Sequence, residues 1–233
     1  MAKIVVLCSG GLDSTTLLHK AVRENREEDI IALTVFYGQK HDKELEAASA
    51  IARTFGISEH KVISLPTSIF AAQTGDAEGS SLISVDGVAM PHMTYQELAE
   101  TRGVSPTYVP FRNANLISAA TSFCMTHGGG EVWCGVHAED ARNWAYPDCT
   151  PEFIGAMQNA IYVGTYHKVR LLAPFQYMMK KDIVRLGLEI HTPYHLTWSC
   201  YEGREDPCGK CPTCVERLEA FKANGVKDPV HYA

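Results

Sequence analysis

Residues 4–14 constrain the fold of this chain more than any other stretch, because they read as a strand, a tight turn and a helix start. Residues 4–7 (IVVL) form an apolar run suited to a buried parallel strand. Residues 9–14 (SGGLDS) follow at once, and apolar residues then recur at helical spacing. A strand that turns directly into a helix predicts the first unit of an α/β fold.

The turn itself predicts a phosphate site. Gly10 and Gly11 let the backbone bend sharply and expose its N–H groups, and the helix that follows adds the positive end of its dipole. Ser9 and Ser14 can donate hydroxyl hydrogen bonds, and Asp13 could order the loop or hold a hydrated Mg²⁺. The loop is neither a Walker A loop nor GxGxxG. The alternative is a glycine turn that only joins a strand to a helix.

The rest of the chain continues the alternation of strands and helices. Further strands are expected at residues 30–37, 61–65, 131–136 and 168–172, and helices at residues 14–24, 43–55, 114–127, 151–163, 179–188 and 215–223. Residues 137–150 read as a polar loop. The β-α-β-α-β start implies right-handed crossovers, and so we expect an open parallel five-stranded sheet with helices on both faces.

The chain divides into two expected parts. Residues 1–190 would form the α/β domain, and residues 191–233 a small metal-binding C-terminal tail. Within the domain, residues 66–106 are rich in Gly, Ser, Thr, Met and Pro with little periodicity. A loop this long is usually functional or mobile, so we interpret it as an active-site flap, with partial disorder as the alternative.

Four cysteines near the C-terminus have the spacing C-x7-C-x2-C-x2-C. They are Cys200, Cys208, Cys211 and Cys214. Four thiolates at such short spacing favour a structural, tetrahedral zinc site, with an iron–sulfur cluster, disulfides or free thiols as the alternatives. Because no ligand position would remain for water, such a metal would fold the tail and take no part in catalysis. The other four cysteines read mainly as buried small residues, and only Cys149 is a candidate for a pocket role.

Polar residues follow the fourth expected strand. In an open α/β sheet, ligands bind beyond the carboxyl ends of the strands, so this segment should face the glycine turn. Asp140 and Asp148 could accept hydrogen bonds from a purine-like edge, and Tyr146 or Trp144 could stack on a ring. The alternative is a solvated acidic loop.

Three basic residues lie where helices are expected to begin. Lys180 and Lys181 start a helix, where positive charge opposes the helix dipole, and contact with phosphates would explain that placement as well as ordinary solvation does. Arg112, close to another helix N-terminus, suggests the same interpretation.

Composition narrows the classes of function. The chain has 233 residues, 45% of them hydrophobic, and a formal net charge of −6. Lys and Arg are scattered, which favours a small-molecule substrate over nucleic acid. No run approaches membrane-spanning length and the N-terminus lacks a signal-peptide pattern, so we expect a cytoplasmic protein without a membrane partner.

Several motifs in one order carry a resemblance to a known family. The loop at residues 9–14 resembles the SGGxDS loop of enzymes that split ATP to AMP and pyrophosphate. Residues 37–41 (YGQKH), 109–113 (VPFRN), 135–140 (GVHAED) and 146–149 (YPDC) follow it, and then WSCY at residues 198–201 and the four-cysteine spacing. Together they resemble the 7-cyano-7-deazaguanine synthase (QueC) family of PP-loop ATP pyrophosphatases over almost the whole length.

The resemblance implies an activity. It implies an adenine nucleotide alpha hydrolase-like fold and an ATP-dependent ligase that converts 7-carboxy-7-deazaguanine and ammonia to the nitrile, through an adenylated acid and an adenylated amide, on the way to queuosine. It implies ATP, Mg²⁺ and structural Zn²⁺, and it suggests a homodimer. A related enzyme that stops at the amide, or adenylates another carboxylate or a base, is the alternative, and a nucleotide-binding or zinc-ribbon module without turnover is a third.

The resemblance also assigns residues. The pyrophosphate end of ATP would contact Ser9, Gly10, Gly11, Asp13 and Ser14, while Arg112 and Lys180 neutralise developing charge. The wider ATP-binding set would be Cys8, Ser9, Gly10, Gly11, Leu12, Asp13, Ser14, Thr15, Thr16, Leu17, Leu18, Tyr37 and Gln39. Asp140, Tyr146 and Asp148 would lie by the deazaguanine. Two positions depart from the family pattern: Phe111 stands where Gly is usual, and Thr150 where Arg is common.

Overall fold

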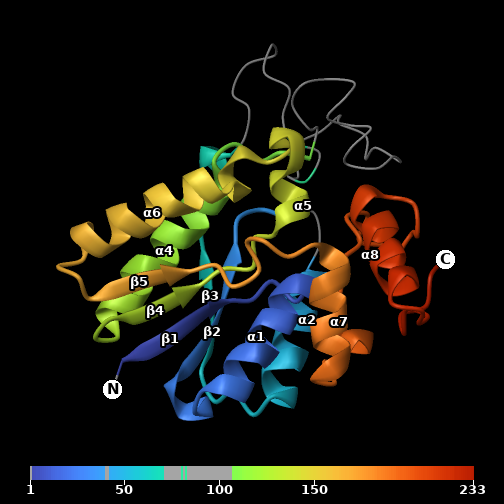
Figure 1. The fold of residues 1–233 in the computed structure, drawn as a ribbon, viewed down its shortest axis with the longest axis horizontal. Coiled ribbons are helices and arrows are strands. Elements are labelled where there is room, and N and C mark those ends of the chain that lie inside the picture. The colour runs from blue at the N-terminus through green and yellow to red at the C-terminus, as the bar shows by residue number, and fades with distance from the viewer. Residues whose placement is uncertain (1, 40–41, 71–79, 81, 83–106) are drawn as a thin grey trace.

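The computed structural model describes residues 2–39, 42–70, 80, 82 and 107–233. In this part of the chain, five parallel strands form one sheet in the order β3-β2-β1-β4-β5 (Figure 1). The strands are β1 Lys3–Leu7, β2 Ile30–Phe36, β3 His60–Ser64, β4 Gly130–Trp133 and β5 Val169–Leu172. The predicted open parallel five-stranded sheet is therefore confirmed.

The apolar character of each strand matches its place in the sheet. β1 lies at the centre, where Val5 pairs with Ile31 on one side and with Val132 on the other. All three residues are fully buried, as expected for strands covered on both faces. β3 is an edge strand with more polar residues, and its Val62 is 51% exposed.

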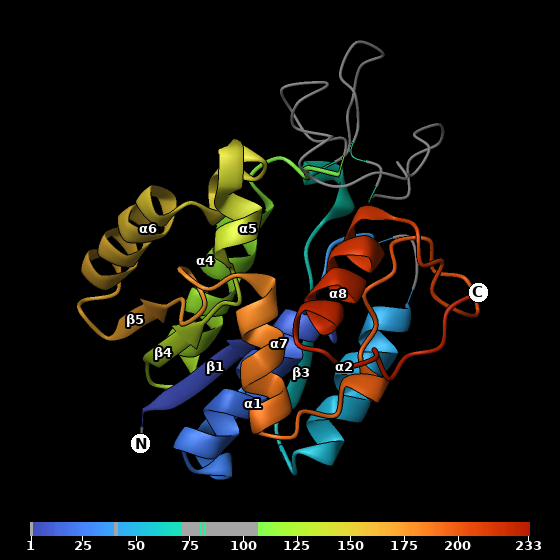
Figure 2. The same cartoon turned by 45° about the vertical axis from the view of Figure 1, so that its right-hand side comes forward.

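Helices cover both faces of the sheet (Figures 1 and 2). Helices α1, α2 and α7 cover one face, with α8 packed against α7, and α4 and α6 cover the other. Their bounds are α1 Leu12–Glu24, α2 Lys43–Thr54, α4 Arg112–Thr126, α6 Pro151–Gly164, α7 Lys180–Glu189 and α8 Pro212–Ala223. The predicted helices are confirmed within three residues at each end. Two hydrophobic clusters result, one on each face.

The expectation of a polar loop at residues 137–150 is wrong. This segment contains helix α5 (Ala138–Ala141) and two 3₁₀ turns, Arg142–Trp144 and Pro147–Cys149. Tyr146 and Cys149 are buried in the same cluster as α4 and α6. Local polarity was a poor guide because several polar residues of this segment are buried, among them His137, Asp148 and Thr150.

Most of the expected flap, residues 66–106, lies outside the described residues. Its first part is visible as a 3₁₀ turn, Thr67–Ile69, and two further turns of this kind occur at Glu27–Asp29 and Tyr194–Leu196. The division of the chain at residue 190 stays a prediction. Phe221 of α8, in the C-terminal part, packs in the same hydrophobic cluster as Leu17 of α1. Among the described helices, none combines the length and apolar character needed to cross a bilayer.

The strand order determines where a ligand can bind. From β1 the chain proceeds to β2 and β3 on one side, and then returns to β4 and β5 on the other. The crossovers therefore diverge between β1 and β4, and a crevice opens at the carboxyl ends of these two strands. The glycine turn at residues 9–11 follows β1 directly.

Candidate active site

A cavity of about 250 Å³ opens at this switch point. Its walls come from the carboxyl ends of β1, β2 and β4, from the first turns of α1, α2 and α4, and from the C-terminal tail. Of the residues predicted from the sequence, the following line it: Cys8, Ser9, Gly11, Leu12, Asp13, Ser14, Tyr37, Gln39, Arg112, Asp140, Tyr146 and Cys149. Segments far apart in the chain thus meet around one space.

The glycine turn depends on Gly10. This residue has φ +85°, and a Cβ placed on it would lie 2.6 Å from Ala48 N and closer still to the carbonyl oxygen of Glu44. Only glycine fits such a backbone conformation against the first turns of α2. Gly11 has an ordinary φ of −76° and is the N-cap residue of α1. The two glycines therefore have different roles, which the sequence did not distinguish.

Hydroxyl groups organise the turn from within. Ser9 N donates to Ser14 Oγ at 3.1 Å, and Gly11 N donates to Ser9 Oγ at 3.3 Å. The two serine hydroxyls lie 3.1 Å apart, and Ser14 Oγ donates to Gly11 O. A turn that holds N–H and O–H donors in place at the N-terminus of a helix is suited to binding an anion.

Five residues of the predicted ATP-binding set do not line the cavity: Gly10, whose backbone packs against α2, and four residues of α1. Thr15, Thr16, Leu17 and Leu18 are fully buried in α1 and do not line the cavity. Thr16 Oγ1 donates to Leu12 O at 2.9 Å and lies 2.8 Å from Tyr194 OH. The leucines belong to the hydrophobic core under the helix.

A buried group of charges lies behind the turn. Asp13 Oδ2 is 3.7 Å from Lys180 Nζ and 3.7 Å from His137 Nε2, and Lys180 Nζ also donates to Glu216 Oε2 at 2.9 Å. Although burial opposes it, the charges of Lys180 and His137 hold the pKa of Asp13 well below its usual range. Asp13 is therefore ionised and anchored on its inner side by two cations.

Lys180 has partners that explain its unfavourable position at the start of α7. The side chain is 92% buried, and its backbone N–H donates to Glu139 Oε2 at 2.6 Å. Burial lowers the pKa of Lys180, but the neighbouring carboxylates of Asp13 and Glu216 raise it well above the ordinary value. The carboxylates of Asp13, Glu216 and Glu139 thus offset the positive charge at the start of α7.

Arg112 is the first residue of α4 and lines the opposite wall of the cavity. Its Nη1 donates to Tyr37 OH at 3.0 Å, and its guanidinium lies 5.5 Å from the centre of the Tyr37 ring. No carboxylate of the described residues forms an ion pair with it. Burial raises the pKa of nearby Glu44 to about 7, an effect that the charge of Arg112 partly offsets. An anionic guest would complete the environment of this guanidinium.

The three residues expected beside the deazaguanine are placed differently from one another. Asp140 lines the cavity with its side chain 25% exposed. Tyr146 also lines it, and its hydroxyl lies 2.5 Å from Thr107 Oγ1. Asp148 is 3% exposed, is not among the lining residues, and accepts a hydrogen bond from Asn113 N at 2.8 Å. Asp148 thus satisfies a backbone donor in the first turn of α4.

Both departures from the family pattern lie at helix N-caps. Phe111, the N-cap residue of α4, has φ +54°, a left-handed conformation that favours glycine. Its ring is 57% exposed and packs edge-on against Phe153. Thr150 is buried at the N-cap of α6, where its hydroxyl oxygen accepts a hydrogen bond from Phe153 N at 3.3 Å. Neither residue is among those that line the cavity.

His137 is a site residue that the sequence reasoning missed. It follows β4, is 1% exposed, and its Nε2 lies 3.3 Å from Asp140 Oδ2 as well as 3.7 Å from Asp13 Oδ2. Although burial opposes it, the carboxylates of Asp140 and Asp13 raise the pKa of His137 to about 9. Its position at a strand end, three residues before an acid, was the available signal.

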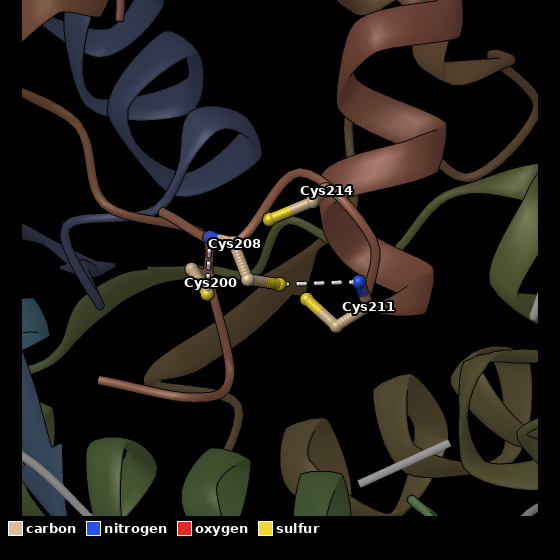
Figure 3. A group of neighbouring side chains, drawn as sticks. All are labelled: Cys200, Cys208, Cys211 and Cys214. Carbon is tan, nitrogen blue, oxygen red and sulfur yellow. Dashed lines mark hydrogen bonds between the residues drawn. The ribbon is translucent and has the colours of Figure 1, made fainter. Parts of the chain in front are cut away.

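The four C-terminal cysteines lie together (Figure 3). Their sulfur atoms all lie within 4.8 Å of one another, all four residues are buried, and none is paired in a disulfide. Backbone N–H groups approach the sulfurs, from Glu202 and Cys208 toward Cys200 and from Lys210 and Cys211 toward Cys208. Buried thiolates stabilised in this way form a closed four-sulfur site that could hold a metal ion.

The cysteine-containing tail is connected to the glycine turn. Trp198 N donates to Gly10 O at 3.0 Å. Arg217 of α8 holds the segment on either side of Trp198, because its Nη1 donates to Thr197 Oγ1 at 2.5 Å and to Ser199 Oγ at 3.3 Å. The tail therefore forms one wall of the cavity.

The fold and this cavity define an open parallel α/β protein in which a serine–glycine turn after the first strand faces a pocket at the topological switch point. A family model described as "Queuosine biosynthesis protein QueC" matches residues 3–225. The chain belongs to the QueC family.

Curated relatives match along their whole length. A 7-cyano-7-deazaguanine synthase of Marinobacter nauticus is 44% identical over 229 residues, which cover 98% of this chain and 96% of the relative. One from Archaeoglobus fulgidus is 43% identical over 232 residues, covering 98% and 89%. Among solved structures, the U34-tRNA thiolase NcsA of Methanococcus maripaludis aligns over 95% of this chain and 66% of its own, with 15% identity and a TM-score of 0.49.

Proposed function

We propose that this protein is an ATP-dependent carbon–nitrogen ligase that converts 7-carboxy-7-deazaguanine and ammonia to 7-cyano-7-deazaguanine in queuosine biosynthesis. The observation that carries the proposal is a single cavity walled on one side by the serine–glycine turn and on the other by Asp140 and Tyr146. Membership of the QueC family, and full-length relatives that bear the synthase name, support it.

The proposed reaction proceeds through two adenylations. The substrate carboxylate attacks the α-phosphorus of ATP and pyrophosphate leaves, which forms an acyl adenylate. Ammonia attacks the acyl carbon, the bond to AMP breaks, and the nitrogen loses a proton to form the amide. The amide oxygen then displaces pyrophosphate from a second ATP. Loss of the remaining nitrogen protons and departure of AMP, which takes the oxygen, form the nitrile.

In this proposal the turn holds the pyrophosphate portion of ATP. The N–H groups of the first turn of α1 and the hydroxyls of Ser9 and Ser14 would donate to phosphate oxygens in place of their present hydrogen bonds to each other. Mg²⁺, when bound, would supply further positive charge to the leaving pyrophosphate. Asp13 and Lys180 would keep the turn in place from behind, since they already form an ion pair.

Arg112 would neutralise charge from the opposite wall. Its guanidinium has an aromatic platform in Tyr37 and no carboxylate partner among the described residues, so an anion of the reaction is its natural counter-charge. Asp140 would accept hydrogen bonds from the deazaguanine edge, and Tyr146 would border its ring. We do not extend this role to Asp148, whose carboxylate is buried against the N-terminus of α4.

Zinc fits the four-cysteine site. Four clustered sulfurs with no water position, together with backbone N–H donors aimed at them, match the donor set of structural zinc. Cys200, Cys208, Cys211 and Cys214 would be the ligands. The ion would stabilise the tail, which in turn contacts the turn through Trp198. We further propose that the protein is cytoplasmic and forms a homodimer. Analytical ultracentrifugation would test the dimer.

The purified protein should be incubated with 7-carboxy-7-deazaguanine, ATP, Mg²⁺ and an ammonium salt, and the products analysed by mass spectrometry. We expect the nitrile, with two AMP formed per nitrile. Amide as the end product would favour the related enzyme that stops halfway. AMP release that does not depend on the deazaguanine acid would overturn the proposal.

A further inference from the structure

His137 lies between the two halves of the proposed site and touches a carboxylate of each. On one side is Asp13 of the phosphate-binding turn, 3.7 Å away, and on the other is Asp140 of the deazaguanine wall, 3.3 Å away. Asp13 and Asp140 both line the cavity, whereas His137 does not and is 1% exposed. The imidazole therefore contacts the back of both acids and leaves the space in front of them open.

The contact to Asp140 uses one carboxylate oxygen. Nε2 of His137 faces Oδ2, and among the described residues no hydrogen bond or ion pair engages Oδ1. The side chain of Asp140 is 25% exposed and borders the cavity. A carboxylate held through one oxygen presents the other in a defined direction, ready to accept from an N–H group.

The carboxylates around His137 outnumber the cations that pair with them. Asp13, Asp140 and Glu216 bring three carboxylates to the neighbourhood of His137, and Lys180 contributes one cation, whose ammonium group contacts Asp13 and Glu216. Among the described ion pairs His137 is the one partner of Asp140, and the charge of Lys180 acts on Asp140 from farther away. Without His137, the Asp140 carboxylate would have no ion-pair partner among the described residues, and nothing would hold its Oδ2 in place.

We propose that His137 is a positioning residue, which clamps Asp140 against Asp13 so that Asp140 Oδ1 is aimed at the N–H donors on the guanine-like edge of the substrate. This inference rests on the proposed function for the identity of the substrate. It explains how the Asp140 carboxylate can be held in one orientation as a hydrogen-bond acceptor. It also links the deazaguanine side of the cavity to the phosphate side through a single imidazole.

A double-mutant cycle tests the proposal. Dissociation constants for 7-carboxy-7-deazaguanine and, separately, for ATP would be measured by calorimetry for the wild type, His137→Leu, Asp140→Asn and the double variant. Each single variant should weaken or remove the hydrogen bond between the substrate N–H group and the Asp140 carboxylate. The affinity for the acid should therefore fall about 10- to 100-fold in each. The double variant should be no more than about threefold weaker than Asp140→Asn, because both changes remove the same interaction.

His137→Gln provides the conservative comparison. It retains a donor near the position of Nε2, so it should recover acid affinity relative to His137→Leu, and it keeps the inference testable if the leucine variant does not fold. The affinity for ATP should change less than that for the acid in every variant. A merely structural role would weaken both ligands alike, and additive losses in the double variant would refute the clamp.

The wild-type measurement separates this inference from the proposed function. If the wild type neither binds nor converts the deazaguanine acid, the proposed function fails and the clamp fails with it. If the wild type converts the acid but His137→Leu and His137→Gln bind it normally, only the clamp is wrong.

Discussion

The buried ion pair between Arg217 and Asp228 offers a sharp test of how the tail supports the site. Both residues are almost fully buried. The Asp228 carboxylate accepts from Arg217 Nε at 2.6 Å and Nη2 at 2.9 Å, from Tyr232 OH at 2.6 Å and from Val230 N at 3.1 Å. Asp228→Asn keeps the shape of this side chain and removes its charge, which leaves a buried guanidinium without its counter-ion.

Removing one partner of a buried pair costs about 3–5 kcal/mol in free energy of unfolding. For a chain of this size, such a loss lowers the melting temperature by about 6–20 °C. Asp206→Asn is the matched control, because Asp206 lies in the same tail with its side chain 50% exposed and only a 3.8 Å contact to His231. It should change the free energy of unfolding by less than about 0.5 kcal/mol.

The same substitution should change the pH dependence of stability. Burial would raise the pKa of Asp228, but the hydrogen bonds and charge of Arg217 hold it below its ordinary value. A lowered pKa means that the stabilisation is present above the ordinary value and is lost as the pH falls through the lowered one. The free energy of unfolding of the wild type should therefore fall more steeply in acid than that of Asp228→Asn.

Chemical denaturation at neutral and acidic pH provides both measurements. Because Arg217 also holds Thr197 and Ser199 on either side of Trp198, the variant should in addition bind ATP less tightly. An Asp228→Asn protein within 1 kcal/mol of the wild type, with an unchanged acid limb, would refute the view that this pair stabilises the tail.

Three further predictions concern the turn, the metal site and α4. Gly10→Ala should cost about 2 kcal/mol or more by denaturation, since its Cβ meets the backbone of α2 at positive φ, whereas Gly11→Ala should cost less than about 1 kcal/mol; equal costs would contradict this distinction. In Cys211→Ser, metal analysis should show that zinc is lost, and the tail should be less stable. The control Cys124→Ser should keep the wild-type zinc stoichiometry. Zinc retained by Cys211→Ser would refute the assignment. Phe111→Gly should be about 1 kcal/mol more stable than Phe111→Ala, because both lose the ring but only glycine fits φ +54° without strain, and a more stable alanine variant would be the contrary result.

Residues that act through local pattern were predictable from the sequence. The five strands and the helices around them follow from periodicity and turn residues within windows of about 10–15 positions, and the structure confirms them. The glycine turn and the four cysteines were recognisable for the same reason, because their chemistry depends on neighbours in the chain. Even Phe111 was visible as an anomaly, although its left-handed backbone was not.

Only the tertiary structure decided which charges meet. The phosphate role of Lys180 stays a prediction, but its ion pairs with Asp13 and Glu216, residues 167 and 36 positions away, were not foreseen. The hydrogen bond that Asp148 accepts from the first turn of α4 was likewise not foreseen, and no role was predicted for His137. Such pairings arise when crossovers bring the carboxyl ends of β1 and β4 side by side and pack α8 against α7. Their free energy depends on burial and on distances of 3–4 Å between distant segments, which no local pattern in the sequence encodes.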